Sequence, residues 1–348
     1  MLLSRTMEKT IVTGGAGFIG SHTCVELVRA GLAPIMVDDL RNSDERVLAG
    51  LEAITGAALP LHRIDCGDRE ALDAVFAAEK PTRVIHFAAD KAVGESVRDP
   101  LKYYRNNIGS LTTLLQVMAN HGVKDLVFSS SCTVYGESQD LPITEGSPTG
   151  EAASPYGYTK VVCERILQDV AAAEPALRVV MLRYFNPVGA HPSGLIGELP
   201  LGVPNNLVPF ITQAAAGLRE KLTVFGDDYP TRDGSCIRDY IHVVDLAKAH
   251  VSALQWLATR QPPVCEVFNL GTGEGSTVLE AVRTFEEVNG VPVPYAIGAR
   301  REGDVMAMYA DTAKSREVLG WRTELTLADA LRDAWRWQQH LLAPQADR

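Results

Sequence analysis

The strongest constraint on the fold is the alternation of short apolar runs with helix-like segments in the first half of the chain. Runs rich in β-branched residues occur at 9–15, 33–39, 83–89, 124–131 and 177–185, with a weaker run at 61–65. Segments with helical spacing lie between them, at about 18–30, 68–79, 101–121 and 156–173. This alternation predicts an α/β fold with a doubly wound parallel sheet, covered by helices on both faces. Ligands of such sheets bind beyond the carboxyl ends of the strands.

The second half of the chain has a different texture. Residues 186–210 are dense in Gly, Pro and Asn, which is typical of ordered loops, and a helical run follows at 244–257. We therefore expect a first domain at 8–185 that binds a dinucleotide. Residues 186–348 would form a smaller C-terminal α/β domain that mainly binds substrate, with segments that can return to the main sheet.

Composition excludes several classes of protein. The net charge of −10 argues against a nucleic-acid or anionic-membrane surface. The six cysteines show no CxxC pair and the eight histidines lack ligand spacing, so we expect free thiols and no metal site. No apolar run reaches membrane-spanning length, and the first ten residues have too short an apolar stretch for a secretory signal. These features favour a cytoplasmic protein.

A glycine-rich motif, "TGGAGFIGSH" (13–22), follows the first apolar run and opens a helix. Gly15, Gly17 and Gly20 satisfy GxGxxG, and Gly14, Gly17 and Gly20 satisfy GxxGxxG. Glycine lets the backbone approach a pyrophosphate, whose charge is favoured at a helix N-terminus. The alternative is a glycine-rich turn without a ligand. The position after the first strand favours a Rossmann-like dinucleotide site.

Asp38 ends the second apolar run, 18 residues after Gly20. A carboxylate there accepts hydrogen bonds from ribose hydroxyls and repels a 2′-phosphate, which favours NAD over NADP. The nearby Arg41 leaves NADP as an alternative. Asp65 would end the third strand, either as an adenine contact or as a turn residue.

The stretch "SPYGYTK" (154–160) places Lys160 four residues after Tyr156, on the same face of a helix. A lysine ammonium and a positively charged nicotinamide both stabilise a phenolate; lowering a tyrosine pKa from ~10 to ~7 requires about 4 kcal/mol. Among the ten tyrosines, only Tyr156 has a lysine at this spacing, so Tyr158 is not the candidate. We predict that Tyr156 is a general base near Ser131, the last residue of the fifth strand. The alternative is a packed tyrosine beside a solvated lysine.

Several longer stretches carry a family resemblance. "HFAADKAVGESVRDPLKYYRNN" (86–107), "SSSCTVYG" (129–136), "LRYFNPVGAHPSG" (182–194), "PNNLVPF" (204–210) and "RDYIHVVDLA" (238–247) resemble the extended short-chain dehydrogenase/reductases, and within them the UDP-galactose (UDP-glucose) 4-epimerases. The resemblance covers nearly the whole chain. It implies reversible 4-epimerisation of UDP-galactose and UDP-glucose through a 4-keto intermediate, with tightly bound NAD, in galactose metabolism. UDP-N-acetylhexosamines are a secondary possibility.

The resemblance also implies a set of site residues. Tyr156, Lys160, Ser131 and Thr133 would be catalytic, with capping of the strand end as the alternative role of Ser131 and Thr133. The NAD site would contain Gly14, Gly17, Phe18, Ile19, Gly20, Asp38, Asp39, Leu40, Arg41, Asn42, Ser43, Asp65, Cys66, Phe87, Ala88, Ala89, Lys91, Asn106, Ser131, Tyr156, Lys160 and Phe185. The UDP-sugar site would contain Ser131, Cys132, Thr133, Tyr156, Asn186, Asn206, Leu207, Thr223, Val224, Phe225, Arg238, Tyr240, Arg301, Asp304 and Met308.

Individual positions in these sets refine the expectation. Arg238 and Arg301 offer bidentate bonds to a diphosphate. Taken alone, each arginine is more often a solvated surface charge, and the resemblance favours the diphosphate role. Asp39 adds negative charge and further disfavours NADP. Cys132 is a buried small residue or a reactive thiol. At the position of Met308, the resemblance associates a bulky residue with unmodified hexoses and a small residue with N-acetylated ones. Methionine is intermediate in size, so both UDP-hexoses and UDP-N-acetylhexosamines stay open as substrates.

Other functions on the same fold remain as alternatives. A 4,6-dehydratase needs an acid just after Thr133, where Val134 and Tyr135 stand instead. A decarboxylase, a simple oxidoreductase or a non-catalytic NAD sensor is disfavoured by the uridine-site segments or by the intact Tyr156 and Lys160.

The resemblance further implies a homodimer through the helices at 101–121 and 156–173. Their apolar positions either contact a second copy or turn inward against the sheet: Leu111, Leu114, Leu115, Met118, Val162, Ile166 and Leu167.

Overall fold

The computed structural model describes residues 7–137, 140–301 and 304–343. The chain forms two compact units. The first contains Met1–Gly136, Thr149–Arg183 and Ala247–Phe268, and the second contains Glu137–Pro148, Tyr184–Leu246 and Asn269–Arg348. Each unit is therefore built from more than one stretch of the chain.

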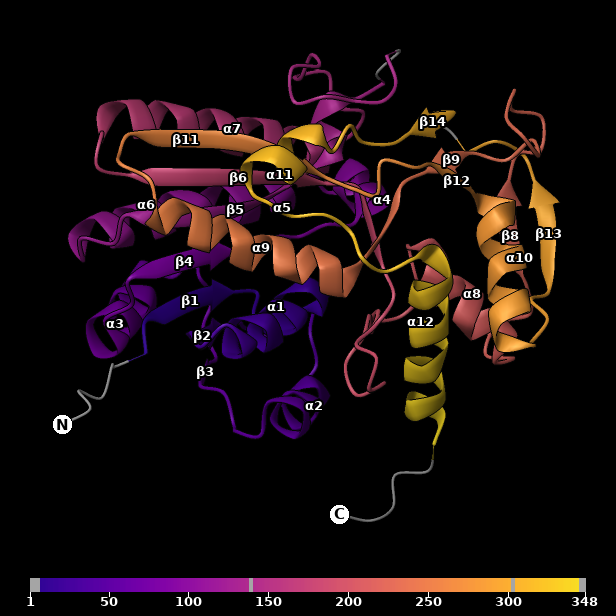
Figure 1. Cartoon of the computed structure of the whole chain (residues 1–348), viewed down its shortest axis with the longest axis horizontal. Helices are drawn as coiled ribbons and strands as arrows, with labels where there is room; N and C mark the ends of the chain where they lie inside the picture. The colour runs from indigo at the N-terminus through magenta and orange to yellow at the C-terminus, as the bar shows by residue number, and fades with distance from the viewer. Residues whose placement is uncertain (1–6, 138–139, 302–303, 344–348) are drawn as a thin grey trace. The chain divides into compact units, whose positions relative to one another are not determined.

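The first unit is built on a seven-stranded sheet with the order β11-β6-β5-β4-β1-β2-β3 (Figure 1). β1 pairs in parallel with β2 and β4, β4 with β5, and β2 with β3. The predicted doubly wound parallel sheet is thus confirmed. The strands are β1 (Lys9–Thr13), β2 (Ala33–Val37), β3 (Leu61–His62), β4 (Arg83–His86), β5 (Asp125–Ser131), β6 (Arg178–Tyr184) and β11 (Val264–Leu270).

The helices of this unit follow the expected alternation, with two additions at α2 and α4. They are α1 (Phe18–Arg29), α2 (Arg46–Thr55), α3 (Arg69–Glu79), α4 (Val93–Arg98), α5 (Pro100–Tyr103), α6 (Gly109–Asn120), α7 (Pro155–Ala173) and α9 (Val243–Ala258). The single helix expected at 101–121 is α5 and α6 joined by a π-helical turn, η1 (Tyr104–Ile108). A short 3₁₀ helix, η2 (Cys132–Tyr135), follows β5.

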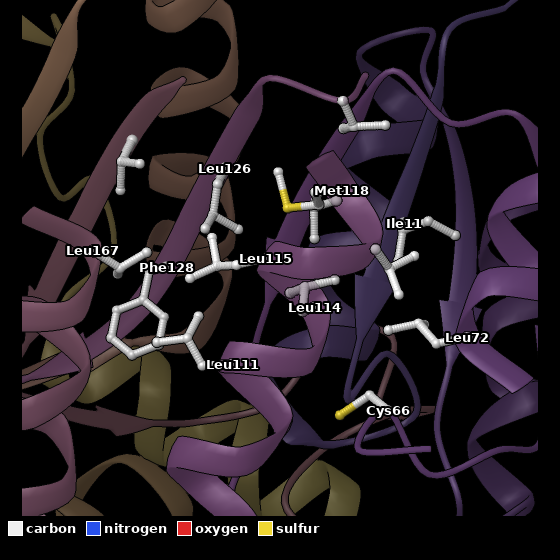
Figure 2. Packing of buried hydrophobic residues seen from close by; sticks show 14 of the residues in the cluster. Ile11, Cys66, Leu72, Leu111, Leu114, Leu115, Met118, Leu126, Phe128 and Leu167 are labelled. Atoms are coloured by element: carbon white, nitrogen blue, oxygen red, sulfur yellow. The ribbon is translucent and has the colours of Figure 1, made fainter. Parts of the chain in front are cut away.

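Alternate residues of the strands bury opposite faces of this sheet. One face packs against α3, α6 and α7, and Figure 2 shows Leu111, Leu115 and Met118 of α6 beside Leu126 and Phe128 of β5. On the opposite face, α9 packs on β11 through edge-to-face contact of the Trp256 and Phe268 rings, 5.6 Å between centroids. Covering both faces explains why these strands are almost wholly apolar.

The second unit contains small sheets and a separate core. Its helices are α8 (Leu207–Ala215), α10 (Val278–Asn289), α11 (Ala313–Val318) and α12 (Leu327–Leu342). Its strands are β7 (Asn186–Val188), β8 (Leu222–Phe225), β9 (Ile237–Arg238), β10 (Tyr240–His242), β12 (Ser276–Thr277), β13 (Tyr295–Gly298) and β14 (Ala307–Met308). Apolar faces of α8, α10 and α12 meet in one hydrophobic cluster. Within the described residues, no helix is long and apolar enough to cross a bilayer.

Candidate active site

The glycine-rich turn between β1 and α1 brings backbone atoms into close contact. Gly14 has a φ of +69°, and a Cβ there would lie 2.9 Å from the backbone nitrogen of Ala88. A Cβ on Gly20 would lie 2.1 Å from the carbonyl oxygen of Gly14, so a side chain cannot fit. Gly17 is the N-cap of α1 and provides no side-chain cap, and the first turn carries no acid. The N-terminal N–H groups of α1 therefore suit a pyrophosphate.

Asp38 organises the loops around this turn. Its Oδ2 accepts a hydrogen bond from the Ala16 N–H at 3.0 Å. Its Oδ1 accepts from the Leu40 N–H at 2.9 Å and from Ser43 Oγ at 2.8 Å. Leu40 has a φ of +64°, a left-handed conformation that is strained for leucine and is typical of functional loops. Asp38 thus fixes the loop in which the ribose contact is predicted.

Arg41 is paired with carboxylates. Its guanidinium contacts Asp39 and Asp65, and its Nη1 donates to Asn106 Oδ1 at 3.2 Å. The hydrogen bond to Asp39, followed by that to Asp65, raises the pKa of Arg41 in spite of partial desolvation. A 2′-phosphate would have to compete with two acids for this guanidinium, which weakens the NADP alternative.

Asp65 does not end the third strand, because β3 stops at His62. Its Oδ1 instead accepts a hydrogen bond from the Gly67 N–H at 2.8 Å, which is the turn role considered as the alternative. Its other oxygen holds Arg41.

A buried acid, Asp90, lies inside the stretch 87–91 that the resemblance assigns to the NAD site. Asp90 is 2% exposed, and its Oδ1 accepts from Asn42 Nδ2 at 3.0 Å. Its Oδ2 is buried and has no hydrogen-bond partner within the described residues. An orphaned buried acceptor suits a ligand donor such as a ribose hydroxyl.

The other predicted NAD residues lie on the same unit, except Phe185. Phe18 and Ile19 open α1; Ala88, Ala89 and Lys91 follow β4; and the ring of Phe87 lies 4.6 Å from that of His250. Cys66 is buried in the core cluster. Phe185 is buried and belongs to the second unit.

Tyr156 and Lys160 occupy the first two turns of α7. Lys160 is 4% exposed, its Nζ donates to the Ser129 carbonyl at 2.7 Å, and it lies 5.0 Å from the centre of the Phe128 ring. Burial lowers the pKa of Lys160 to about 8. The structure therefore excludes a solvated lysine, whereas Tyr156 is half-buried and Tyr158 is 44% exposed.

Ser131 and Thr133 meet at the end of β5. Ser131 Oγ accepts from the Thr133 N–H at 3.2 Å and caps η2, so the alternative capping role of Ser131 is present. Thr133 Oγ1 is buried and has no partner in the described part of the chain, which leaves this hydroxyl able to bind a ligand. Cys132 between them is buried, with 6% exposure.

In the second unit, an acid joins the two predicted diphosphate arginines. Arg238 Nη2 donates to Asp304 Oδ1 at 3.2 Å, and Arg301 Nη2 donates to the same oxygen at 2.8 Å. The guanidinium of Arg301 lies 5.5 Å from the centre of the Phe225 ring, and Met308 is the register partner of Arg238 between β14 and β9. Five predicted UDP-site residues are thus neighbours.

The two arginines differ in exposure. The side chain of Arg238 is 15% exposed, and that of Arg301 is 57% exposed. The surface-charge alternative therefore applies to Arg301 only.

The remaining predicted UDP-site residues lie on adjacent elements of this unit. Asn186 of β7 is in register with Tyr240 of β10, and burial raises the pKa of Tyr240. Asn206 precedes Leu207 at the start of α8 and donates to Glu198 Oε1 at 2.6 Å. Thr223 and Val224 belong to β8. Across the ranges that the structure describes, no group of three His, Cys, Asp or Glu side chains is placed to hold a metal.

Comparison with known proteins places this geometry in a family. A UDP-glucose 4-epimerase of Yersinia pestis is 52% identical over 94% of this chain and 96% of its own length. A crystal structure of UDP-glucose-4-epimerase from Stenotrophomonas maltophila, with bound NAD and formylated UDP-arabinopyranose, has a TM-score of 0.94 and 48% identity over 97% of this chain and 99% of its own. The crystal structure of UDP-glucose 4-epimerase from Bifidobacterium longum, in complex with NAD⁺ and UDP, has a TM-score of 0.91 and 48% identity. The match covers 95% of this chain and 98% of that chain. The family model of the NAD dependent epimerase/dehydratase family matches residues 10–271, and the chain belongs to this family.

Proposed function

We propose that this protein interconverts UDP-galactose and UDP-glucose by epimerisation at C4 of the sugar, with NAD as its bound cofactor. The observation that carries the proposal is the buried, carbonyl-bound Lys160 one helical turn after Tyr156, beside the end of β5. The relatives support the same reaction, since those compared above are named UDP-glucose 4-epimerases.

Residues of the first unit would hold the cofactor. The uncapped N-terminus of α1 receives the pyrophosphate, and Asp38 and Asp90 supply carboxylate oxygens to ribose hydroxyls. When bound, NAD supplies reversible acceptance of the hydride from C4 of the sugar. The carboxylates around Arg41 favour NAD over NADP.

The chain's own chemistry concerns one proton. Tyr156 removes the proton of the sugar 4-hydroxyl and returns it after the 4-keto sugar has turned over. The Lys160 ammonium stabilises the phenolate and, held by the Ser129 carbonyl, cannot move to solvent. The hydroxyl of Thr133, which has no partner among the described residues, hydrogen-bonds the sugar oxygen, and Ser131 holds Thr133 through its N–H.

Residues of the second unit would bind uridine diphosphate. Arg238 and Arg301 donate to the diphosphate oxygens, and Phe225, 42% exposed, offers a face to the uracil. Asp304, which both arginines hold, accepts from the ribose when they turn to the phosphates. Met308 next to Arg238 leaves room for UDP-N-acetylhexosamines as further substrates.

A dehydratase is the second function within this family, and the residues after Thr133 disfavour it. Val134 is fully buried, and the hydroxyl of Tyr135 accepts a hydrogen bond from Arg183 Nη1 at 2.9 Å. Neither side chain is an acid that can protonate a leaving hydroxyl. A decarboxylase, a simple oxidoreductase or a non-catalytic sensor has no specific observation in its favour.

The test is conversion of UDP-galactose by the purified protein without added NAD, with the sugars followed by proton NMR. We expect UDP-glucose to form until a fixed ratio is reached, and Tyr156→Phe to abolish it. The Tyr158→Phe variant, which alters the exposed tyrosine two residues away, is the control and retains activity. Absence of conversion, with or without supplied NAD, would falsify the proposal.

We further propose that the enzyme is a homodimer. Five of the seven apolar residues first considered for the interface do not support it, because Leu111, Leu114, Leu115, Met118 and Leu167 are buried in the core of the first unit. Val162 and Ile166 are only partly buried. Exposed apolar side chains lie instead on α4 and α5, both of which contact α7: Val93 at 50%, and Val97 and Leu101 at 62% each.

Sedimentation of the Leu101→Glu variant tests this surface. It should be monomeric, whereas Leu218→Glu, which alters a similarly exposed leucine of the second unit, should sediment like the parent. A parent that is itself monomeric at micromolar concentration would refute the dimer. We place the enzyme in the cytoplasm, because its six cysteines are free thiols.

A further inference from the structure

Glu164 extends the row of catalytic side chains along α7. It lies four residues after Lys160, which itself lies four residues after Tyr156, so one face of the helix carries all three. Glu164 is 4% exposed, unlike Arg165 and Asp169 further along the same helix, which form a surface pair at 74% and 60% exposure. A buried carboxylate is costly unless it is paired and hydrogen-bonded.

Two strands provide the partners of Glu164. Ser130 Oγ of β5 donates to its Oε1 at 2.6 Å. Arg183 of β6 donates Nε to Oε1 at 2.8 Å and Nη2 to Oε2 at 2.5 Å, and both members of this pair have side chains only 5% exposed. The geometry is bidentate, which is the strongest arrangement for a guanidinium and a carboxylate.

The network continues from Arg183 to η2. Arg183 Nη1 donates to Tyr135 Oη at 2.9 Å, and the guanidinium lies 4.9 Å from the centre of that ring. Tyr135 ends η2, which contains Thr133. On β5, three consecutive serines then act together: the Ser129 carbonyl binds Lys160, Ser130 binds Glu164, and Ser131 caps η2.

Burial and neighbouring side chains act on the charge of Lys160. Burial lowers the pKa of its ammonium to about 8, while Cys163 and Glu164 on the same helix act in the opposite direction. Facing it from β4, His86 stays neutral, because burial and then the charge of Lys160 lower the pKa of His86 to about 3. Glu164 is therefore the carboxylate that helps Lys160 keep its proton.

We propose that Glu164 is a positioning residue: with Arg183, Ser130 and Tyr135 it fixes α7 against the end of β5 and η2, and it sustains the charge on Lys160. This inference rests on the proposed function of Tyr156 and Lys160. It adds a second set of residues that determines how readily Tyr156 ionises.

The test compares Glu164→Gln with the parent. Glutamine keeps the shape and one acceptor, but removes the charge and the bidentate carboxylate that binds Arg183. We expect kcat to fall about tenfold at neutral pH, and the pH of half-maximal rate to move by about one unit to the alkaline side. KM for UDP-galactose should change less than twofold. A purely structural loss would lower the rate equally at every pH.

A second readout does not depend on turnover. Ultraviolet difference titration of the parent against Tyr156→Phe reports ionisation of this one phenol, and the same difference taken in the Glu164→Gln background should have its midpoint at higher pH. If the two midpoints coincide, the inference is wrong, whatever the parent catalyses. A parent that fails to epimerise but shows the shift would instead contradict the proposed function alone.

Two further variants distinguish the specific effect of Glu164 from the loss of any acid on α7 and from a loss of folding. Asp169→Asn removes an exposed acid of the same helix and should leave the rate, the pH profile and the phenol midpoint unchanged. If Glu164→Gln does not fold, the double variant Glu164→Gln/Arg183→Met removes both buried charges, which often restores stability. It should fold and still show the alkaline shift of the phenol midpoint; a midpoint equal to that of the parent would overturn the proposal.

Discussion

The charged groups of the two units are held in different ways. Around α7 in the first unit, Lys160, Glu164 and Arg183 are each only 4% exposed and are bound to backbone or to one another. In the second unit, Arg238 and Arg301 share one carboxylate, Asp304, and Arg301 is more than half exposed.

This difference separates two demands. A proton-transfer group must have its geometry and charge in place before the substrate arrives, because reorganisation adds to the barrier. A diphosphate-binding group can exchange one anionic partner for another, since Asp304 already occupies the place of an anion. The buried set should therefore affect kcat, and the exchangeable set should affect KM.

The largest expected effect comes from Lys160→Met. Without the ammonium, the phenolate of Tyr156 loses its nearest positive charge, and kcat should fall on the order of 10²–10³-fold with little change in KM. Steady-state kinetics with UDP-galactose measure both. A rise in KM with unaltered kcat would break the comparison.

Arg238→Gln should have the next largest effect. Loss of a charge-assisted bond to the diphosphate corresponds to about 1.5–3 kcal/mol, or roughly 10–150-fold in KM, with kcat nearly preserved. Calorimetric titration with UDP provides a check without turnover. Unchanged affinity for UDP would show that Arg238 serves only to hold Asp304.

The stability of the protein against pH tests the burial of His86, which faces Lys160 from β4. His86 is fully buried and hydrogen-bonded to Thr13 Oγ1 at 2.7 Å, and burial lowers its pKa from 6.5 to about 3. Because the folded pKa is depressed, the unfolded chain binds the extra proton, so stability is present above pH 6.5 and is lost as the pH falls towards 3. The loss should approach ~1.4 kcal/mol per pH unit.

Urea unfolding of the parent and of His86→Gln between pH 6.5 and 4 measures this slope. In the variant, the slope of the unfolding free energy against pH should be smaller by the amount that corresponds to about one bound proton. Identical slopes in the two proteins would show that His86 is protonated in the folded state.

The smallest effect is expected for Arg301→Gln. At 57% exposure, this guanidinium should contribute only about threefold to fivefold to KM. The matched control is Arg300→Gln, because Arg300 pairs with the exposed Asp228 and is not among the predicted site residues. Equal effects of the two variants would remove Arg301 from the UDP site.

The sequence predicted the strands and helices that are encoded by the pattern of neighbouring residues. The alternation of apolar runs predicted β1 to β6 within about two residues at most ends, and the spacing of Tyr156 and Lys160 placed both on α7. It did not predict β11, the seventh strand of the main sheet. It did not predict which side chains are buried together. Glu164 and Arg183 have ordinary sequence contexts, and only their pairing between α7 and β6 shows them as one set.

The apolar residues of α6 illustrate the same limit. Leu111, Leu114 and Leu115 have a spacing that fits either a partner subunit or the sheet, and only their packing on β5 decides between the two (Figure 2). Likewise, the ion pairs of Asp304 depend on β9 and β14 lying in register.

The most direct test of the central claim follows the hydrogen at C4. UDP-galactose carrying deuterium at C4 is incubated with the protein in ordinary water, without added NAD, and the products are analysed by NMR and mass spectrometry. The account predicts UDP-glucose that retains the deuterium at C4, because the hydride that leaves is the one that returns, while Tyr156 handles only the hydroxyl proton. UDP-glucose with hydrogen from water at C4, or no UDP-glucose at all, would contradict it.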